Sequence, residues 1–232
     1  MNLLTRPDVF RRNHKALRKA LFDTAVQAGR TEFTQPGEIA CLMTQFGEMT
    51  YFSHVHAYME DTFCLPVLEA KCPGASIRHM QSHQEIDQML HALEVQLSDV
   101  VNGAEDERNQ LGYTFYLSLN RFVALCLSHL DDEETEMATL AYAVCSDEEL
   151  QQINQQIMDS TTPIEADILY RYMVQALNET EQASLLNEVS GTAPASVREK
   201  LRVIAQAGGP YKTTYNQPEP MKNIIPFYMP VN

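Results

Sequence analysis

The amino-acid sequence predicts an all-α protein: an up-down-up-down four-helix bundle with additional C-terminal helices and an extended Pro-rich tail. Long stretches are rich in Leu, Ala, Glu, Gln and Met, which are good helix formers, and the 232-residue chain has no Trp and 9 Gly. Glycine and proline gather in short clusters between these stretches, which predicts tight connections between antiparallel helices. The chain is long enough to bury a sizeable core.

Turn-forming residues divide the first part of the chain into four long helices. Asp8, directly after Pro7, is expected to open the first helix, and Gly29 to close it. The next helix starts at Pro36-Gly37, and further breaks are expected at Cys72-Pro73-Gly74 and Asn102-Gly103. We therefore expect long helices over about residues 8–29, 36–69, 76–101 and 105–144.

Shorter helices are expected after this bundle. Residues 1–145 form the predicted bundle domain, residues 146–207 a helical extension packed on it, and residues 208–232 a tail whose prolines prevent long helices. The expected short helices cover about residues 147–158, 162–177, 181–189 and 197–205. The extension contains no histidine, so the histidine chemistry described below is confined to the first two-thirds of the chain.

Each long helix carries histidine or glutamate at positions where a bundle normally buries leucine. Steps of four and three residues along each helix define these core-facing stripes. The ends of the second and fourth stripes run through His56, Glu60, Phe63 and Val67, and through His129, Glu133, Glu136 and Leu140. The first stripe contributes His14, and the third contributes His79 and His83.

The glutamates of these stripes decide what the pattern means. Glu60 and Glu133 each stand four residues after a histidine, so each pair shares one helical face. Burying an isolated carboxylate costs several kcal/mol unless a partner compensates its charge. None of the stripes carries a lysine or arginine. A buried metal is therefore the interpretation that the sequence favours.

The number and type of ligands favour two iron ions. Seven ligands are too many for one tetrahedral zinc, and a mixture of imidazole and carboxylate suits iron better than magnesium or calcium. Two irons offer about twelve coordination positions; five imidazoles, two bridging carboxylates and a bridging oxide or hydroxide fill all but about one. The remaining position would suit a small diatomic ligand.

The ligand pattern resembles that of the hemerythrin-like proteins. The similarity covers about residues 8–145 and rests on the order and spacing of the motifs His14, His56-x-x-x-Glu60, His79-x-x-x-His83 and His129-x-x-x-Glu133. It implies a non-haem di-iron centre, oxo- or hydroxo-bridged, inside a four-helix bundle. In that arrangement His14 and His56 serve one iron, and His79, His83 and His129 serve the other. Glu60 and Glu133 bridge the two ions.

Two features differ from the oxygen-carrying branch of that family. Carriers typically place an aspartate five residues after the last histidine, whereas Glu133 follows His129 by four, so carrier function is not implied. His79 lies near the predicted start of its helix, where Ser76 is the expected N-cap. Many relatives have no ligand at the position of His79.

Composition narrows the possible partners. The formal net charge of −14 and the pI near 4.8 disfavour binding to nucleic acid or to anionic membranes. No apolar stretch reaches the roughly 20 residues needed to span a bilayer, and the N-terminal sequence lacks a signal-peptide pattern. We therefore expect a cytoplasmic protein. A basic run on the first helix, residues 11–19, is expected to be a solvated face.

The cysteines and the two remaining histidines are expected to play minor roles. The 5 cysteines include no Cys-x-x-Cys pair, which argues against a disulfide framework or a zinc knuckle, so free thiols are expected. Cys126 precedes His129 by one turn and is interpreted as a small core residue. His54 and His91 lie off the stripes and are expected near the surface or around the ligands.

The sequence thus predicts a di-iron protein that binds dioxygen or nitric oxide at one open iron position, for binding, storage or sensing. An alternative is a di-iron enzyme: an oxidase, a peroxide- or nitric-oxide-handling enzyme, or an iron-sulfur repair protein. Such an enzyme needs an electron source, and the chain has no flavin, nicotinamide or haem motif. A metal-free helical interaction module is a further alternative, in which both glutamates would have to be protonated or to point outward.

Overall fold

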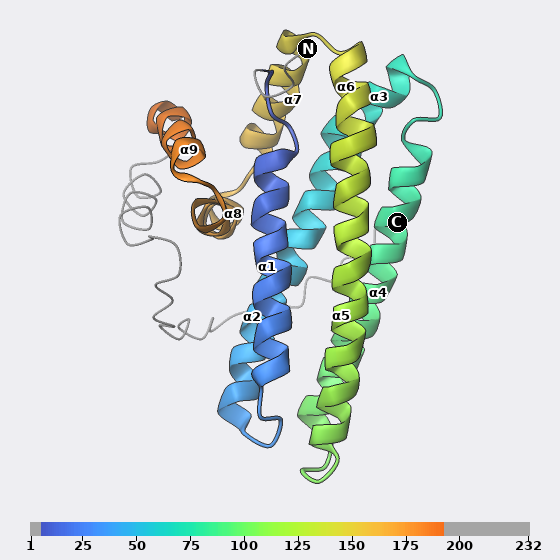
Figure 1. Cartoon of the computed structure of the whole chain (residues 1–232), viewed down its shortest axis with the longest axis vertical. Coiled ribbons are helices and arrows are strands. Elements are labelled where there is room, and N and C mark those ends of the chain that lie inside the picture. The colour runs from blue at the N-terminus through green and yellow to red at the C-terminus, as the bar shows by residue number, and fades with distance from the viewer. Residues whose placement is uncertain (1–5, 193–232) are drawn as a thin grey trace.

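The computed structural model describes residues 6–192, and this part of the chain is helical throughout, with no strand (Figure 1). The predicted all-α class is therefore confirmed. Four long rods make up the bundle, and two of them contain a short π-helical segment, in which the helix is locally widened. In order, the rods are α1 (Arg11–Arg30); α2 (Pro36–Met59), η2 (Glu60–Cys64) and α3 (Leu65–Lys71); α4 (Ile77–Asn102); and α5 (Arg108–Asp132), η3 (Glu133–Met137) and α6 (Ala138–Val144).

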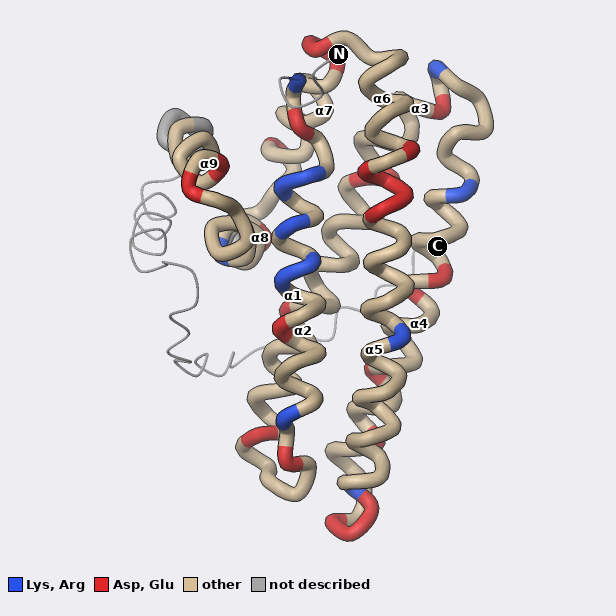
Figure 2. The backbone as a smooth tube through the Cα atoms, viewed as in Figure 1, with Lys and Arg blue, Asp and Glu red and all other residues tan. Residues whose placement is uncertain are grey.

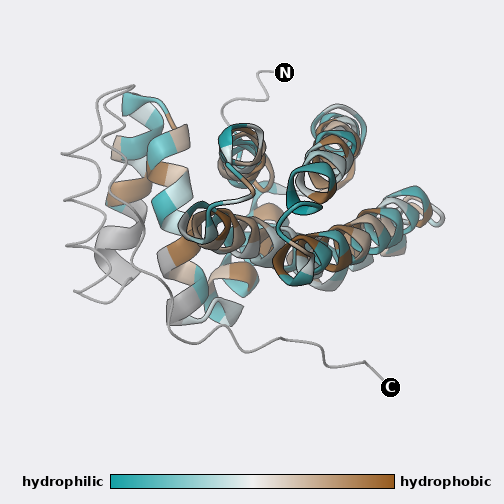
Figure 3. Ribbon diagram, turned by 90° about the horizontal axis from the view of Figure 1, so that it is seen from below, coloured by the Kyte–Doolittle hydropathy of each residue, from teal (hydrophilic) through white to brown (hydrophobic). Residues whose placement is uncertain are grey.

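The rods run up and down in sequence and close a four-cornered bundle. Short turns connect them, and each rod packs against two others: α1 against α2 and α5, and α4 against α5 and α2. Figure 3 views the bundle close to its axis, with apolar positions concentrated between the rods. This is the arrangement expected when each helix has one apolar stripe to bury.

The helix boundaries agree with the sequence prediction to within a few residues. Within the four rods the largest differences lie at two N-termini, since α1 starts at Arg11 rather than at Asp8 and α5 starts at Arg108 rather than near residue 105. Asp8 precedes α1 because its carboxylate accepts hydrogen bonds from the backbone N–H groups of Arg11, at 3.0 Å, and Arg12, at 3.2 Å. It therefore satisfies two of the free N–H groups at the helix start.

The apolar core of the bundle is divided into two clusters. Phe10, directly before α1, and Leu17 of α1 belong to different clusters, and His14 lies between them. On α2, His56 likewise separates Phe52 from Met59. The four rods therefore bury a polar layer between two apolar regions, and all the side chains of that layer must find partners within it.

Three further helices follow the bundle: α7 (Asp147–Ser160), α8 (Pro163–Ala176) and α9 (Glu179–Thr192). The first two begin with a capping box, Ser146 with Glu149 and Thr162 with Glu165. Helix α8 packs against α1 and α2, and Figure 1 shows it nearly end-on while the rods run lengthwise. The helix predicted at residues 197–205 and the tail at 208–232 lie outside the described residues.

A partly buried ion pair holds α8 against α2. Glu48 accepts hydrogen bonds from both terminal nitrogens of Arg171, at 2.9 and 3.0 Å, and from the hydroxyl of Tyr172 at 3.0 Å. The Gln45 amide in turn donates to the Tyr172 hydroxyl at 2.7 Å. Because α2 is covered by α8 as well as by the bundle, it buries Glu48 and Phe52 in addition to its predicted stripe.

The helix surfaces test two predictions: the absence of a membrane-spanning segment and the solvation of the basic run on α1. No helix among residues 6–192 is long and apolar enough to cross a bilayer. The basic run of α1, blue in Figure 2, is an ion-paired face rather than a purely solvated one, which corrects the prediction. Lys15, for example, binds both carboxylate oxygens of Glu181 in α9, at 2.6 and 2.7 Å.

One glycine allows α5 to approach the turn between α1 and α2. A Cβ atom added at Gly112 would lie 2.2 Å from ring atoms of Phe33, which is itself buried, whereas one added at Gly37 would meet nothing within 4 Å. We expect Gly112→Ala to lower the free energy of unfolding by about 1–3 kcal/mol through overpacking. Gly37→Ala is the matched control and should leave stability unchanged or slightly raised. Urea unfolding followed by circular dichroism measures both; equal stability of the two variants would contradict this packing.

Candidate metal centre

The polar layer brings together six of the seven side chains that the sequence predicted as ligands. They form two groups, and in each group one donor atom from every residue lies within 4.8 Å of the others. The groups are His14, His56, Glu60 and Glu133, and Glu60, His83, His129 and Glu133. Both contain the same two glutamates, so two neighbouring ions would each face two imidazoles and would share both carboxylates.

The unsatisfied atoms of this layer fit a metal site. The Nε2 atoms of all four histidines in the two groups are buried and have no hydrogen-bond partner. Three carboxylate oxygens are likewise buried without a hydrogen-bond partner: both oxygens of Glu133 and the Oε2 atom of Glu60. Even His129 Nε2 and Glu133 Oε1, which lie 2.8 Å apart, are not hydrogen-bonded to each other. Buried polar atoms without partners cost about 1–3 kcal/mol each, and a pair of cations would satisfy these atoms together.

Each shared glutamate is the first residue of a π-helical segment. Glu60 opens η2 and Glu133 opens η3, directly after the α-helices that carry His56 and His129. A π-turn inserts an extra residue into the helical repeat, and such turns are frequent at functional sites. Both rods therefore have the same local construction: a histidine in the last α-turn and a glutamate where the helix widens.

The π-turns shift the buried faces of both rods by one residue, which corrects the predicted stripes. Beyond Glu60 the buried residues are Cys64, Leu65 and Leu68, whereas the predicted Phe63 and Val67 are only partly buried. Beyond Glu133 the shift is the same. The buried residues of η3 and α6 are Met137, Ala138 and Ala141, whereas the predicted Leu140 is partly buried and Glu136 is exposed. A regular helical repeat cannot anticipate this change of register.

Two further carboxylates contact histidines of the two groups from outside the polar layer. Glu134 Oε1 lies 3.0 Å from Nδ1 of His14, and Asp61 Oδ1 lies 2.8 Å from Nδ1 of His83. Each of these acidic residues directly follows a shared glutamate and reaches a histidine on another rod. A carboxylate at Nδ1 keeps that nitrogen protonated and leaves Nε2 free to bind a metal.

The two outer carboxylates differ in ion pairing and in exposure. Arg18 binds both oxygens of Glu134, at 2.5 and 3.3 Å, whereas the Asp61 side chain is 41% exposed. The sequence analysis missed Asp61, Glu134 and Arg18. An acidic residue immediately after each predicted bridging glutamate was the available signal for the first two. Nothing in the sequence marked Arg18 among the other basic residues of α1.

His79 lies at the edge of the layer. It is buried at the start of α4, and its ring centroid is 6.3 Å from that of His129. It belongs to neither of the two groups that the described residues form. Burial lowers the pKa of His79, so its imidazole is neutral and chemically able to bind a metal. The predicted set of three histidines for one ion is thus assembled only in part.

The electrostatics of the layer are those of an anionic site that attracts cations. Burial alone would lower the pKa of His14, but the nearby carboxylates of Glu134, Glu60 and Glu133 outweigh it and raise that pKa to about 9. Burial would also lower the pKa of His83, but the carboxylates of Asp61, Glu133 and Glu60 outweigh it and raise that pKa to about 11. In the absence of metal both rings are therefore protonated, and metal binding must displace those protons.

The other residues considered in the sequence lie outside both groups. His54 and His91 are exposed, and His54 pairs with Asp87 at 3.1 Å. All 5 cysteines are free thiols, as predicted. Cys126 is buried in the larger apolar cluster, and burial raises the pKa of its thiol to about 12. It therefore stays protonated, in agreement with its interpretation as a core residue.

The outer carboxylates generate a prediction about metal affinity. Glu134→Gln removes the charge that orients His14 and should weaken metal binding by about 10- to 100-fold, as for other outer carboxylates of metal sites. Glu136→Gln is the matched control. Glu136 lies two residues further along and is exposed. Its carboxylate pairs with Arg78 at 2.8 Å, away from the histidines of the polar layer. Titration against a competing chelator measures both variants, and an unchanged affinity of Glu134→Gln would refute this role.

Comparison with known proteins agrees with the geometry. The family model described as "Hemerythrin HHE cation binding domain" matches residues 5–141, which cover the first three rods, the fourth rod up to residue 141 and every residue of the polar layer. No curated protein and no solved structure matches the chain significantly. The chain belongs to the hemerythrin HHE cation binding domain family.

Proposed function

We propose that this protein is a non-haem di-iron protein that binds dioxygen or nitric oxide at a coordination position that its own side chains leave free. The observation that carries the proposal is the pair of buried histidine-glutamate groups that share Glu60 and Glu133. Sharing both carboxylates would hold two ions close together, which a single-metal site does not require. The family match supports cation binding, and the choice of iron rests on the donor atoms.

The donor set leaves room at each ion. Two imidazole nitrogens and two carboxylate oxygens occupy four of about six positions around an iron ion. A bridging oxygen would take one more. Iron bound there would supply reversible electron transfer to a diatomic molecule. The chain itself would hold the ions, keep Nδ1 of His14 and His83 protonated through Glu134 and Asp61, and exclude bulk water with the apolar clusters on either side.

The position of His79 favours a second candidate function. Without His79, both groups have the same composition of two histidines and two glutamates, and both ions would be open to an external ligand. A pair of open ions suits turnover of dioxygen, peroxide or nitric oxide better than simple binding. A di-iron enzyme is therefore the alternative, and it would need an electron donor outside the described residues. The metal-free interaction module is disfavoured by the buried carboxylate atoms without partners.

The metal content of variants on one helix tests the proposal. Protein produced with iron should contain about two irons per chain, with near-ultraviolet charge-transfer bands from the oxygen bridge. His83→Ala should lose iron, because His83 belongs to one of the two groups, whereas His79→Ala, one turn earlier on α4, should keep most of it. The reduced protein should then bind nitric oxide, followed by its absorbance.

Specific results would contradict the proposal. A single tightly bound zinc with no iron would refute the di-iron centre. Iron-loaded protein that does not react with nitric oxide, dioxygen or azide would refute the open position. Sustained consumption of peroxide or nitric oxide with an added electron donor would identify the enzyme instead.

A further inference from the structure

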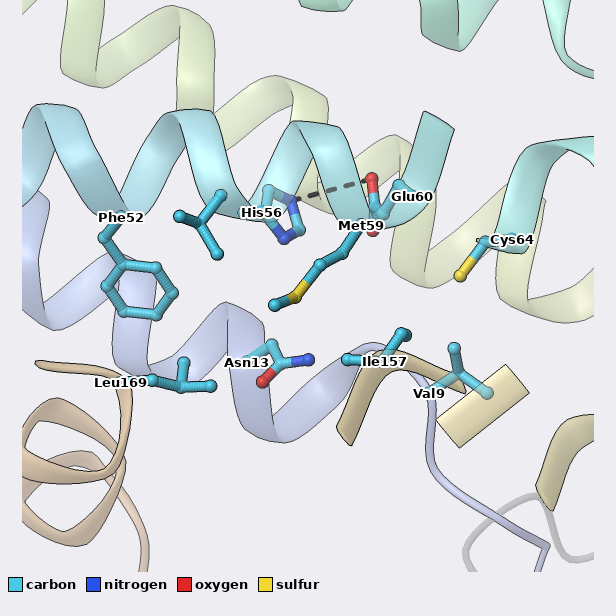
Figure 4. Close-up of a pocket in the computed structure, with 10 residues that line it drawn as sticks. Val9, Asn13, Phe52, His56, Met59, Glu60, Cys64, Ile157 and Leu169 are labelled. Carbon is cyan, nitrogen blue, oxygen red and sulfur yellow. Dashed lines mark ion pairs between the residues drawn. The ribbon is translucent and has the colours of Figure 1, made fainter. Parts of the chain in front are cut away.

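A small pocket opens beside the metal layer on the side of the bundle that faces the C-terminal helices. His56 and Glu60 form its inner end, and Figure 4 shows the ring of His56 and the side chain of Met59 directed towards its interior. The Nε2 atom of His56 and the Oε2 atom of Glu60 are both buried and have no hydrogen-bond partner. The pocket is therefore lined by two residues of the group that contains His14 and His56.

The outer wall of this pocket comes from helices that lie beyond the four rods. Ile157 of α7 and Leu169 of α8 lie to either side of Asn13, and all three lie opposite His56 (Figure 4). Both residues follow the stretch matched by the family model, which ends at residue 141. Part of the wall on this side is consequently supplied by a part of the chain that the family match does not include.

Two sets of contacts hold this wall in place. Helix α7 is fixed to the start of the chain by a hydrogen bond of 3.1 Å from the amide of Asn154 to the backbone oxygen of Asp8. Helix α8 is fixed by the buried Glu48, which binds Arg171 and Tyr172. Ile157 and Leu169 are thus held by buried or partly buried contacts on both sides of the pocket.

The lining identifies the class of molecule that fits. Apart from the metal-layer residues His56 and Glu60, Asn13 is the one polar side chain among the described residues that line the pocket. Moving a charged molecule through such walls is costly, whereas a neutral diatomic molecule loses little on leaving water. One amide side chain offers only a few donor and acceptor positions, which suits a ligand of very few atoms.

We propose that this pocket admits and holds a small neutral molecule on its way to the metal of the His14 and His56 group, and that Ile157 and Leu169 set how readily it enters. The role of the pocket in metal chemistry rests on the function proposed above. The affinity of the pocket for a small apolar molecule does not, because its walls are complete without any metal.

A second pocket offers the competing route. It lies inside the bundle, between all four rods, and is lined by Leu17, Ile86, Cys126 and Leu130 next to His56, His83 and His129. It contains no residue of α7 or α8. Changes at Ile157 and Leu169 should therefore leave this interior route unaffected, which makes the two routes distinguishable.

Xenon and nitric oxide together test the proposal. Crystals of the protein pressurised with xenon should show a xenon atom in the pocket beside Ile157, whether or not metal is present. In stopped-flow mixing of the iron-loaded, reduced protein with nitric oxide, Ile157→Ala and Leu169→Ala should each bind it about threefold to tenfold faster, within the range over which association rates vary among variants of one site. Ile153→Ala is the matched control. Ile153 is buried one turn earlier on α7 and does not line the pocket, so its rate should equal that of the unmodified protein.

The possible outcomes separate the two proposals. Xenon bound only in the interior pocket, or equal rates for the Ile157, Leu169 and Ile153 variants, would overturn the entry route. Because Ile157 and Leu169 lie on different helices, a folding defect in one variant leaves the other informative. Xenon in the outer pocket without any reaction with nitric oxide would support the pocket as a binding site and refute the proposed metal chemistry.

Discussion

The structure depends on how two buried carboxylates, Glu60 and Glu133, are compensated in the middle of an apolar bundle. The Glu133 side chain is fully buried, and Glu60 is only slightly less so. Burial opposes ionisation of Glu133, but the surrounding histidines His129, His56 and His83 reverse this and hold its pKa well below the usual value. The helices around these carboxylates must supply cationic partners or metal ligands at this level instead of apolar side chains. The polar layer therefore divides the apolar core into two clusters.

The same layer explains the repeated construction of the two π-containing rods. Each rod supplies a histidine, a glutamate at the start of a π-turn and then an acidic residue, Asp61 or Glu134, that reaches a histidine on another rod. Widening the helix after the glutamate restores an apolar face for the second cluster. The two halves are not equivalent, however, since Arg18 fixes Glu134 while Asp61 is partly open to solvent.

Much of this arrangement was predictable from the sequence, because helix period, turn residues and ligand spacing are local properties. The four rods and the convergence of the histidine and glutamate stripes follow from them. The π-turns were not predictable, since a regular period placed Phe63 and Glu136 in the core, and no residue type signals the added residue. The ion pair between Glu48 and Arg171 was also missed, because it joins residues 123 positions apart. His79 has the correct spacing but lies beside the two groups, a difference that depends on tertiary geometry.

The C-terminal helices α7 and α8 cover one side of the bundle next to the polar layer, where Ile157 and Leu169 line the outer pocket.

The central claim is that the layer binds two iron ions that share Glu60 and Glu133. Anomalous diffraction at the iron absorption edge, from crystals of protein produced with iron, tests it most directly. Two neighbouring peaks are expected, one between His14 and His56 and the other between His83 and His129. Glu60 and Glu133 should both contact each peak. A single peak, or density that is anomalous at the zinc edge alone, would contradict it.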